Sequence, residues 1–77
     1  MFHYEFGIGS VINVKTPKVN SLDEIKKEFT QTANQISSHF EYPNGLILDI
    51  IQTASKIEWT TNKRIILLED GTLGFED

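Results

Sequence analysis

The chain has 77 residues, no cysteine, 39% hydrophobic residues, and a formal charge of −4 from eleven Asp and Glu against seven Lys and Arg. This length predicts a single domain whose small core buries only about 60% of the surface that the unfolded chain exposes. The composition excludes disulfides and thiolate metal sites, is too apolar for a disordered chain, and argues against a surface that binds phosphate backbone over its whole extent.

The apolar segments are too short for a targeting or membrane role. The N-terminal sequence has no basic residue before its apolar part and is interrupted by Glu5, so it does not have the pattern of a signal peptide. The longest apolar runs, residues 46–48 and 65–68, are far shorter than the roughly 20 residues that cross a bilayer. We therefore expect a cytoplasmic protein that does not contact membranes.

Residues 1–16 have the alternation of a β-strand. Phe2, Tyr4 and Phe6 alternate with His3 and Glu5, which places the aromatic side chains on one face and His3 on the other. Glycines then interrupt the pattern before a β-branched segment resumes. A hairpin that turns near residues 7–10 is the simplest interpretation, and one bulged strand is the alternative.

Residues 21–41 have the spacing of an amphipathic helix. Ser21 and Glu24 form a capping-box pattern, and Asp23 and Glu24 would lie at the positive end of the helix dipole. Apolar residues then recur every three or four positions, and Pro43 would end the helix. The residues of this stripe are Leu22, Ile25, Phe29, Ala33, Ile36 and Phe40.

Residues 45–58 fit a helix better than a strand. Wound as a helix, most of their apolar side chains fall within one arc, whereas a strand would show no clean alternation. Asn44 would cap this helix, although Asn44-Gly45 equally suits a hairpin turn. Leu48 and Trp59 are the exceptions to the helical pattern.

Residues 63–76 have the pattern of a β-hairpin, because Asp70-Gly71 separates two apolar segments and such a turn needs positive φ. The element order predicts a small single α+β domain spanning residues 1–77. Its antiparallel sheet would join the N-terminal strand or strands to the C-terminal hairpin. Two helices, at about 21–41 and 45–58, would pack on one face of that sheet.

We expect no catalytic residue, no metal ligand and no cofactor. Gly7-Ile8-Gly9 does not continue into a phosphate-binding loop, and the two histidines, His3 and His39, lie on different predicted elements without ligand spacing. No nucleophile–base pair is fixed by the sequence either. The protein is therefore predicted not to be an enzyme.

The residues that we expect at a partner surface are aromatic, apolar or acidic. Residues 1–68 have a net charge of zero, so the last nine residues carry the whole excess of −4. Tyr42 and Trp59 lie at junctions of predicted elements, and Leu48 falls on the polar side of the second predicted helix. The predicted partner surface comprises Tyr42, Leu48, Trp59, Glu69, Asp70, Glu76 and Asp77.

The sequence predicts a non-catalytic protein–protein interaction module or regulator that forms a homodimer. Val11, Ile66 and Leu68 would make the second face of the sheet apolar, and a second copy would cover it. One alternative is an acidic inhibitor of phage or plasmid type, a nucleic-acid mimic that binds the basic groove of a nuclease or polymerase. A weaker alternative is a winged-helix-like DNA binder that uses Lys63 and Arg64, although nucleic-acid binding is otherwise not expected.

Overall fold

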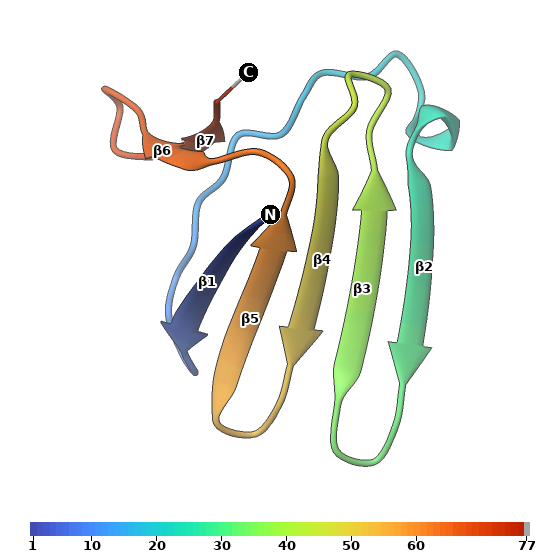
Figure 1. Ribbon diagram of the computed structural model, residues 1–77, viewed down its shortest axis with the longest axis vertical. Coiled ribbons are helices and arrows are strands. Elements are labelled where there is room, and N and C mark those ends of the chain that lie inside the picture. The colour runs from blue at the N-terminus through green and yellow to red at the C-terminus, as the bar shows by residue number, and fades with distance from the viewer. Residues whose placement is uncertain (77) are drawn as a thin grey trace.

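The computed structural model describes residues 1–76, and these form an all-β fold (Figure 1). Five strands make one antiparallel sheet in the order β1-β5-β4-β3-β2, and two short strands, β6 and β7, make a separate hairpin. The only helical element in this range is a single 3₁₀ turn, η1 (Leu22–Glu24). The strands are β1 (Phe2–Gly7), β2 (Lys26–Gln31), β3 (Ile36–Glu41), β4 (Ile47–Gln52), β5 (Lys56–Thr61), β6 (Ile65–Leu67) and β7 (Leu73–Phe75).

The predicted helix at 21–41 is wrong. The capping-box residues do form local contacts, but they stabilise only η1: the Ser21 hydroxyl accepts from the Asp23 amide (3.2 Å) and the Glu24 carboxylate from the Asn20 amide (2.9 Å). The chain then becomes extended and forms the β2–β3 hairpin, whose register pairs Phe29 with Ser38. A capping signal therefore nucleates a turn here without a helix following it.

The predicted helix at 45–58 is also wrong, and the hairpin alternative for Asn44-Gly45 is correct. Gly45 adopts a φ of +93°, and its amide donates to the Tyr42 carbonyl (3.0 Å), which closes the turn between β3 and β4. Residues 47–52 and 56–61 then pair as β4 and β5. The β-branched residues of these segments suit a pleated surface, and pairing with two neighbours outweighs their helical spacing.

The N-terminal hairpin predicted near residues 7–10 is not formed. β1 ends at Gly7 and pairs along its whole length with β5, a strand from the second half of the chain. Residues 8–21 turn away and return as an irregular segment, which contacts β7 through a parallel bridge between Val14 and Leu73.

The C-terminal hairpin is confirmed, because β6 pairs antiparallel with β7 across a turn in which Gly71 has a φ of +85°. It does not join the sheet of β1, however, so the predicted α+β sheet built from both termini is replaced by an all-β arrangement of two sheets. Val11, Ile66 and Leu68 therefore lie outside the five-stranded sheet and do not make its second face apolar.

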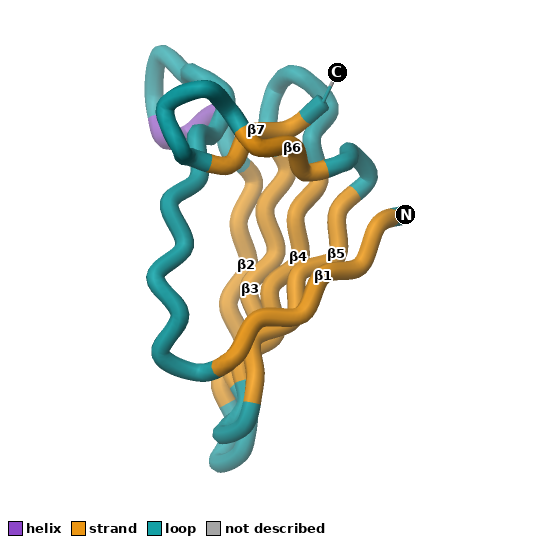
Figure 2. The backbone as a smooth tube through the Cα atoms, turned by 90° about the vertical axis from the view of Figure 1, so that its left-hand side faces the viewer, coloured by secondary structure: helices purple, strands orange, loops and turns teal. Residues whose placement is uncertain are grey.

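The core lies between one face of the five-stranded sheet and the segments that run beside it. Residues 8–21 pass along this face, and the β6–β7 hairpin crosses its end (Figure 2). The Ile65 amide donates to the Tyr4 hydroxyl (3.0 Å) and ties the hairpin to β1. The buried hydrophobic side chains of residues 1–76 are few: Leu46, Leu48 and Trp59. No helix in this range has the length and apolar character needed to cross a membrane.

Candidate functional site

The five-stranded sheet has two chemically different faces. On the apolar face, β5 contributes Ile57 and Trp59, and β4 contributes Leu48 and Ile50. We call the opposite side the open face, because neither residues 8–21 nor the β6–β7 hairpin covers it (Figure 2). The open face carries mostly polar side chains, namely His3, Glu5, Lys26, Glu28, Thr30, Ser37, His39, Glu41, Asp49, Lys56, Glu58 and Thr60, together with Ile47 and Ile51.

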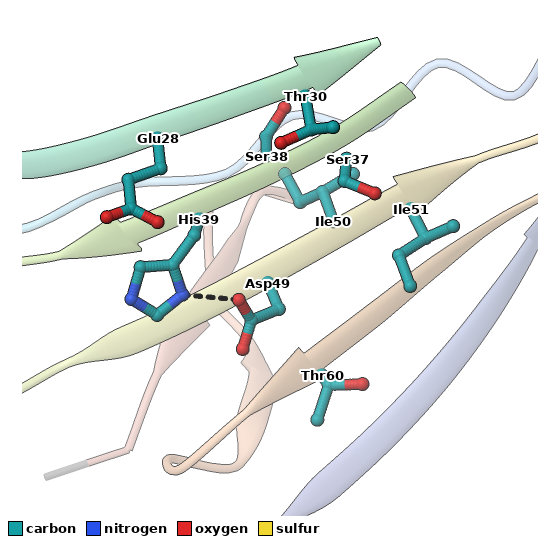
Figure 3. A pocket seen from close by; sticks show the side chains of 9 residues that line it. All are labelled: Glu28, Thr30, Ser37, Ser38, His39, Asp49, Ile50, Ile51 and Thr60. Atoms are coloured by element: carbon teal, nitrogen blue, oxygen red, sulfur yellow. Dashed lines mark hydrogen bonds and ion pairs between the residues drawn. The ribbon is translucent and has the colours of Figure 1, made fainter. Parts of the chain in front are cut away.

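One row of polar residues crosses the open face perpendicular to the strands. The register places its members directly opposite one another, one from each of the five strands. Both histidines belong to this row, which the sequence patterns did not indicate. In order across the sheet, the row is Glu28, His39, Asp49, Thr60 and His3, and Figure 3 shows all but the last.

His39 has a carboxylate at each ring nitrogen. Nδ1 contacts Asp49 on β4, and Nε2 lies 3.1 Å from Glu41 on its own strand. The Tyr42 amide donates to the Leu46 carbonyl, so Tyr42–Leu46 is a hydrogen-bonded pair of the β3–β4 ladder. Because such pairs alternate, His39–Asp49, three positions further along, is a non-hydrogen-bonded pair. Opposite side chains approach most closely in such pairs. Because both neighbours favour the imidazolium, chiefly Asp49, they raise the pKa of His39 above 6.5.

His3 lies at the other end of the row, on β1, beside two carboxylates. Its Nδ1 lies 3.2 Å from the Thr60 hydroxyl, while Nε2 lies 3.4 Å from Glu58 and 3.8 Å from Glu5. The Lys56 ammonium, 3.0 Å from Glu5, lowers the pKa of that carboxyl, and the Glu5 carboxylate in turn raises the pKa of Lys56.

A shallow depression of about 540 Å³ lies over the His39 end of the row and is open to solvent (Figure 3). The hydroxyls of Thr30 and Ser37 line it beside His39. Since both nitrogens of His39 already face carboxylates, neither is placed to accept a proton from these hydroxyls. The arrangement suits binding better than nucleophilic catalysis.

Within residues 1–76, the outward backbone groups of the edge strand β2 have no hydrogen-bond partner. The Thr32 amide donates to the Gln35 carbonyl (2.8 Å), which makes Thr32–Gln35 a hydrogen-bonded pair. Because such pairs alternate along an antiparallel ladder, the backbone groups of Lys27, Phe29 and Gln31 point away from β3, toward the open edge. Every residue of β2 is exposed, and Phe29 at its centre is 67% exposed.

The structure separates the apolar members of the predicted partner surface from the acidic ones. Leu48 is 4% exposed and Trp59 is 7% exposed, so both belong to the core, where the Trp59 ring packs edge-on against Phe6 at 5.5 Å. Tyr42 is partly buried, and this burial raises the pKa of its hydroxyl. Leu48 and Trp59 are therefore not accessible to a partner in this structure.

The acidic residues at the C-terminal hairpin are largely engaged within the chain. Lys15 lies 2.6 Å from Asp70, and together with hydrogen bonds from Thr72 it holds the pKa of Asp70 well below its usual range. Arg64 lies 3.9 Å from Glu76. Glu69 is exposed, and Asp77 lies outside the described residues.

Residues 1–76 do not contain the two-helix unit on which the winged-helix alternative depended.

Neither the histidine row nor the β2 edge was predicted from the sequence. The signal for the row was present in residues 36–41, where Ile36, Ser38 and Phe40 alternate with Ser37, His39 and Glu41. The helical spacing of the aromatic residues obscured this alternation. Comparisons with protein families, curated proteins and solved structures give no match to this chain.

Proposed function

We propose that this chain is a non-catalytic interaction module that self-associates by pairing β2 with the β2 strand of a second copy. The observation that carries the proposal is the open edge of β2, where three residues direct backbone groups outward around an exposed Phe29. Such an edge is a template for another strand, and pairing there would satisfy these groups within a continuous sheet.

The sequence of β2 suits one antiparallel register in particular. A two-fold axis at Phe29 would place Phe29 opposite Phe29 of the second copy, Lys27 opposite Gln31, and Glu28 opposite Thr30. All three outward-facing residues would then lie in hydrogen-bonded pairs, and no like charges would be opposed. The Phe29 rings would meet beside Phe40, which already contacts Phe29 edge-on at 5.8 Å.

Neighbouring registers are less favourable. An axis at Glu28 would set two carboxylates opposite each other, and an axis at Lys27 would oppose two ammonium groups, both of which destabilise a sheet. An axis at Thr30 would leave Lys27 without a partner in the strand. Lysines often protect sheet edges from pairing, but in β2 the charges disfavour the competing registers and leave the Phe29 register open.

On the other edge strand, β1, two side chains are covered by contacts with the rest of the molecule. On β1, the Tyr4 hydroxyl accepts from the Ile65 amide, and the Phe6 ring packs against Trp59. Phe29 at the centre of β2 contacts Phe40 but remains 67% exposed, so β2 is the edge that gains most from a second copy.

Sedimentation velocity at tens of micromolar tests the proposal. We expect a dimer for the wild type and monomers for Phe29→Lys and Lys27→Pro. The lysine would be opposed to another lysine, and the proline removes an outward N–H while leaving the β2–β3 ladder intact. Leu67→Lys is the matched control, because Leu67 is 74% exposed but lies on β6, and it should remain dimeric.

Two results would contradict the proposal. One is a wild type that stays monomeric across this concentration range. The other is a dimer that survives both β2 substitutions, which would place the contact elsewhere, for example at β1. Far-UV circular dichroism of each variant checks that a monomer is a folded monomer.

A further inference from the structure

Three side chains at the β1 end of the open face direct potential metal ligands toward one another. They are His3 and Glu5 on β1 and Glu58 on β5. His3 Nε2 lies 3.4 Å from Glu58 Oε1 and 3.8 Å from Glu5 Oε1, and the three ligand atoms all lie within 4.8 Å of one another. No sequence spacing reveals this group, because the pairing of β1 with β5 assembles it.

The register of this strand pair creates an unfavourable carboxylate pair. Glu5 lies directly opposite Glu58. The Thr53 amide donates to the Lys56 carbonyl (3.0 Å), so the backbone groups of Lys56, and by alternation those of Glu58, point toward β4. Glu58 therefore makes no backbone hydrogen bond to β1. Glu5–Glu58 is thus a non-hydrogen-bonded pair, in which side chains approach closely. Two like charges in this position repel each other, and a cation beside both carboxylates offsets the repulsion, as the Lys56 ammonium does here.

Thr60 orients the His3 ring. Thr60 is the residue opposite His3, and its hydroxyl lies 3.2 Å from Nδ1. A histidine that binds a metal through one nitrogen commonly donates its other N–H to an oxygen, which fixes the tautomer. With Nδ1–H donating to Thr60, the lone pair of Nε2 faces the two carboxylates.

We propose that His3 Nε2, Glu5 Oε1 and Glu58 Oε1 form a binding site for a divalent first-row transition-metal ion, for which Zn²⁺ is the probe. Zn²⁺ bonds to nitrogen and oxygen at about 2.0–2.2 Å, so neighbouring ligands in a tetrahedral site lie roughly 3.3 Å apart. The separations of 3.4 and 3.8 Å from Nε2 are already close to this value. Open coordination positions would face solvent.

Lys56 competes with the metal ion for the same carboxylates. Its ammonium lies 3.0 Å from Glu5 and 3.6 Å from Glu58, and its side chain is 45% exposed. A half-exposed lysine can move away at small cost, and the divalent ion would take its place. Removing the Lys56 charge should therefore strengthen metal binding.

The cluster around His39 provides a matched control within the same face. It also combines one histidine with two carboxylates, but Asp49 contacts Nδ1 whereas Glu41 contacts Nε2. The two carboxylates lie on opposite sides of the ring, so one ion cannot bind one ring nitrogen and both carboxylates together.

Isothermal titration of the untagged protein with ZnCl₂ tests the site. We expect one ion per chain, a loss of affinity of about tenfold or more in His3→Gln, and tighter binding in Lys56→Gln. His39→Gln should bind as the wild type does. Phe29→Lys should also keep the affinity, because the site does not depend on association through β2.

The proposal would be overturned if the wild type gave no saturable binding. It would also be overturned if His39→Gln lost as much affinity as His3→Gln, because binding would then not be specific to the His3 cluster. Since His3 is exposed, His3→Gln should keep the fold, and circular dichroism verifies this. As a second readout, the ¹H–¹³C NMR signal of the His3 ring should shift on Zn²⁺ addition while the His39 signal does not.

Discussion

At the scale of single residues, cross-strand pairing determines the environment of both histidines. His39 faces two carboxylates because the β3–β4 register sets Asp49 opposite it and Glu41 follows it on the same face. His3 faces two carboxylates because β5 brings Glu58 beside β1. Similar residue types thus form two clusters of different geometry, and strand register is what differs between them.

The His39 cluster gives a pH dependence with a definite sign. Its folded-state pKa lies above 6.5, so protonated His39 stabilises the fold. This contribution is fully present below 6.5 and is lost as the pH rises through the folded-state value. NMR titration of the His39 ring should give a pKa above 6.5, and Asp49→Asn should lower it more than Glu41→Gln does, because Asp49 makes the larger contribution. A ring that titrates at or below 6.5 in the wild type would contradict this assignment.

At the scale of elements, two-residue alternation and the Asp-Gly turn were more informative than apolar residues at helical spacing. Alternation in β1 and the Asp70-Gly71 turn predicted a strand and a hairpin that the structure contains. The spacing of Phe29 and Phe40 predicted a helix, yet the β2–β3 hairpin also brings these two rings together, at 5.8 Å. The spacing of these apolar residues is therefore compatible with both a helix and a β-hairpin, and only long-range strand pairing decides between the two.

The candidate sites could not be predicted from the sequence, because they too depend on long-range strand pairing. The His3 cluster requires the pairing of β1 with β5, and the free edge of β2 requires knowing which strands have a neighbour on both sides. Neither the β1–β5 pairing nor the free edge of β2 follows from local sequence, because both depend on how all the strands of the sheet are ordered. The buried positions of Leu48 and Trp59 also follow from strand alternation, which a helical interpretation of residues 45–58 obscures.

The turn between β6 and β7 offers a test of backbone conformation. Gly71 has a φ of +85°, where an added Cβ is strained, so Gly71→Ala should lower the free energy of unfolding by about 1–2 kcal/mol. Gly7→Ala is the control, because Gly7 lacks a positive φ and a Cβ there would meet only the Ser10 hydroxyl at 3.9 Å. Urea unfolding followed by Trp59 fluorescence measures both. Equal stability of Gly71→Ala and the wild type would refute the role assigned to this glycine.

At the scale of the whole molecule, the sheet is better covered at its β1–β5 side than at β2. Residues 8–21 and the β6–β7 hairpin run beside the apolar face (Figure 2). The buried side chains belong to β4, β5 and the turn before β4. Phe29 and Ile36, at the β2 side, remain exposed. A second copy that extends the sheet through β2 would place a second Phe29 beside the first and shield this side from solvent.

A cysteine trap tests this association and its register together, because the chain has no native cysteine. In the proposed register Glu28 faces Thr30 of the second copy in a non-hydrogen-bonded pair, where Cα atoms lie about 4.5 Å apart and a disulfide can form. Mild oxidation of the double variant Glu28→Cys/Thr30→Cys at tens of micromolar should give a covalent dimer with two disulfides, detected by intact mass spectrometry. Each single variant should remain largely uncrosslinked. A double variant that stays monomeric under these conditions, or single variants that crosslink equally well, would contradict self-association through β2 in this register.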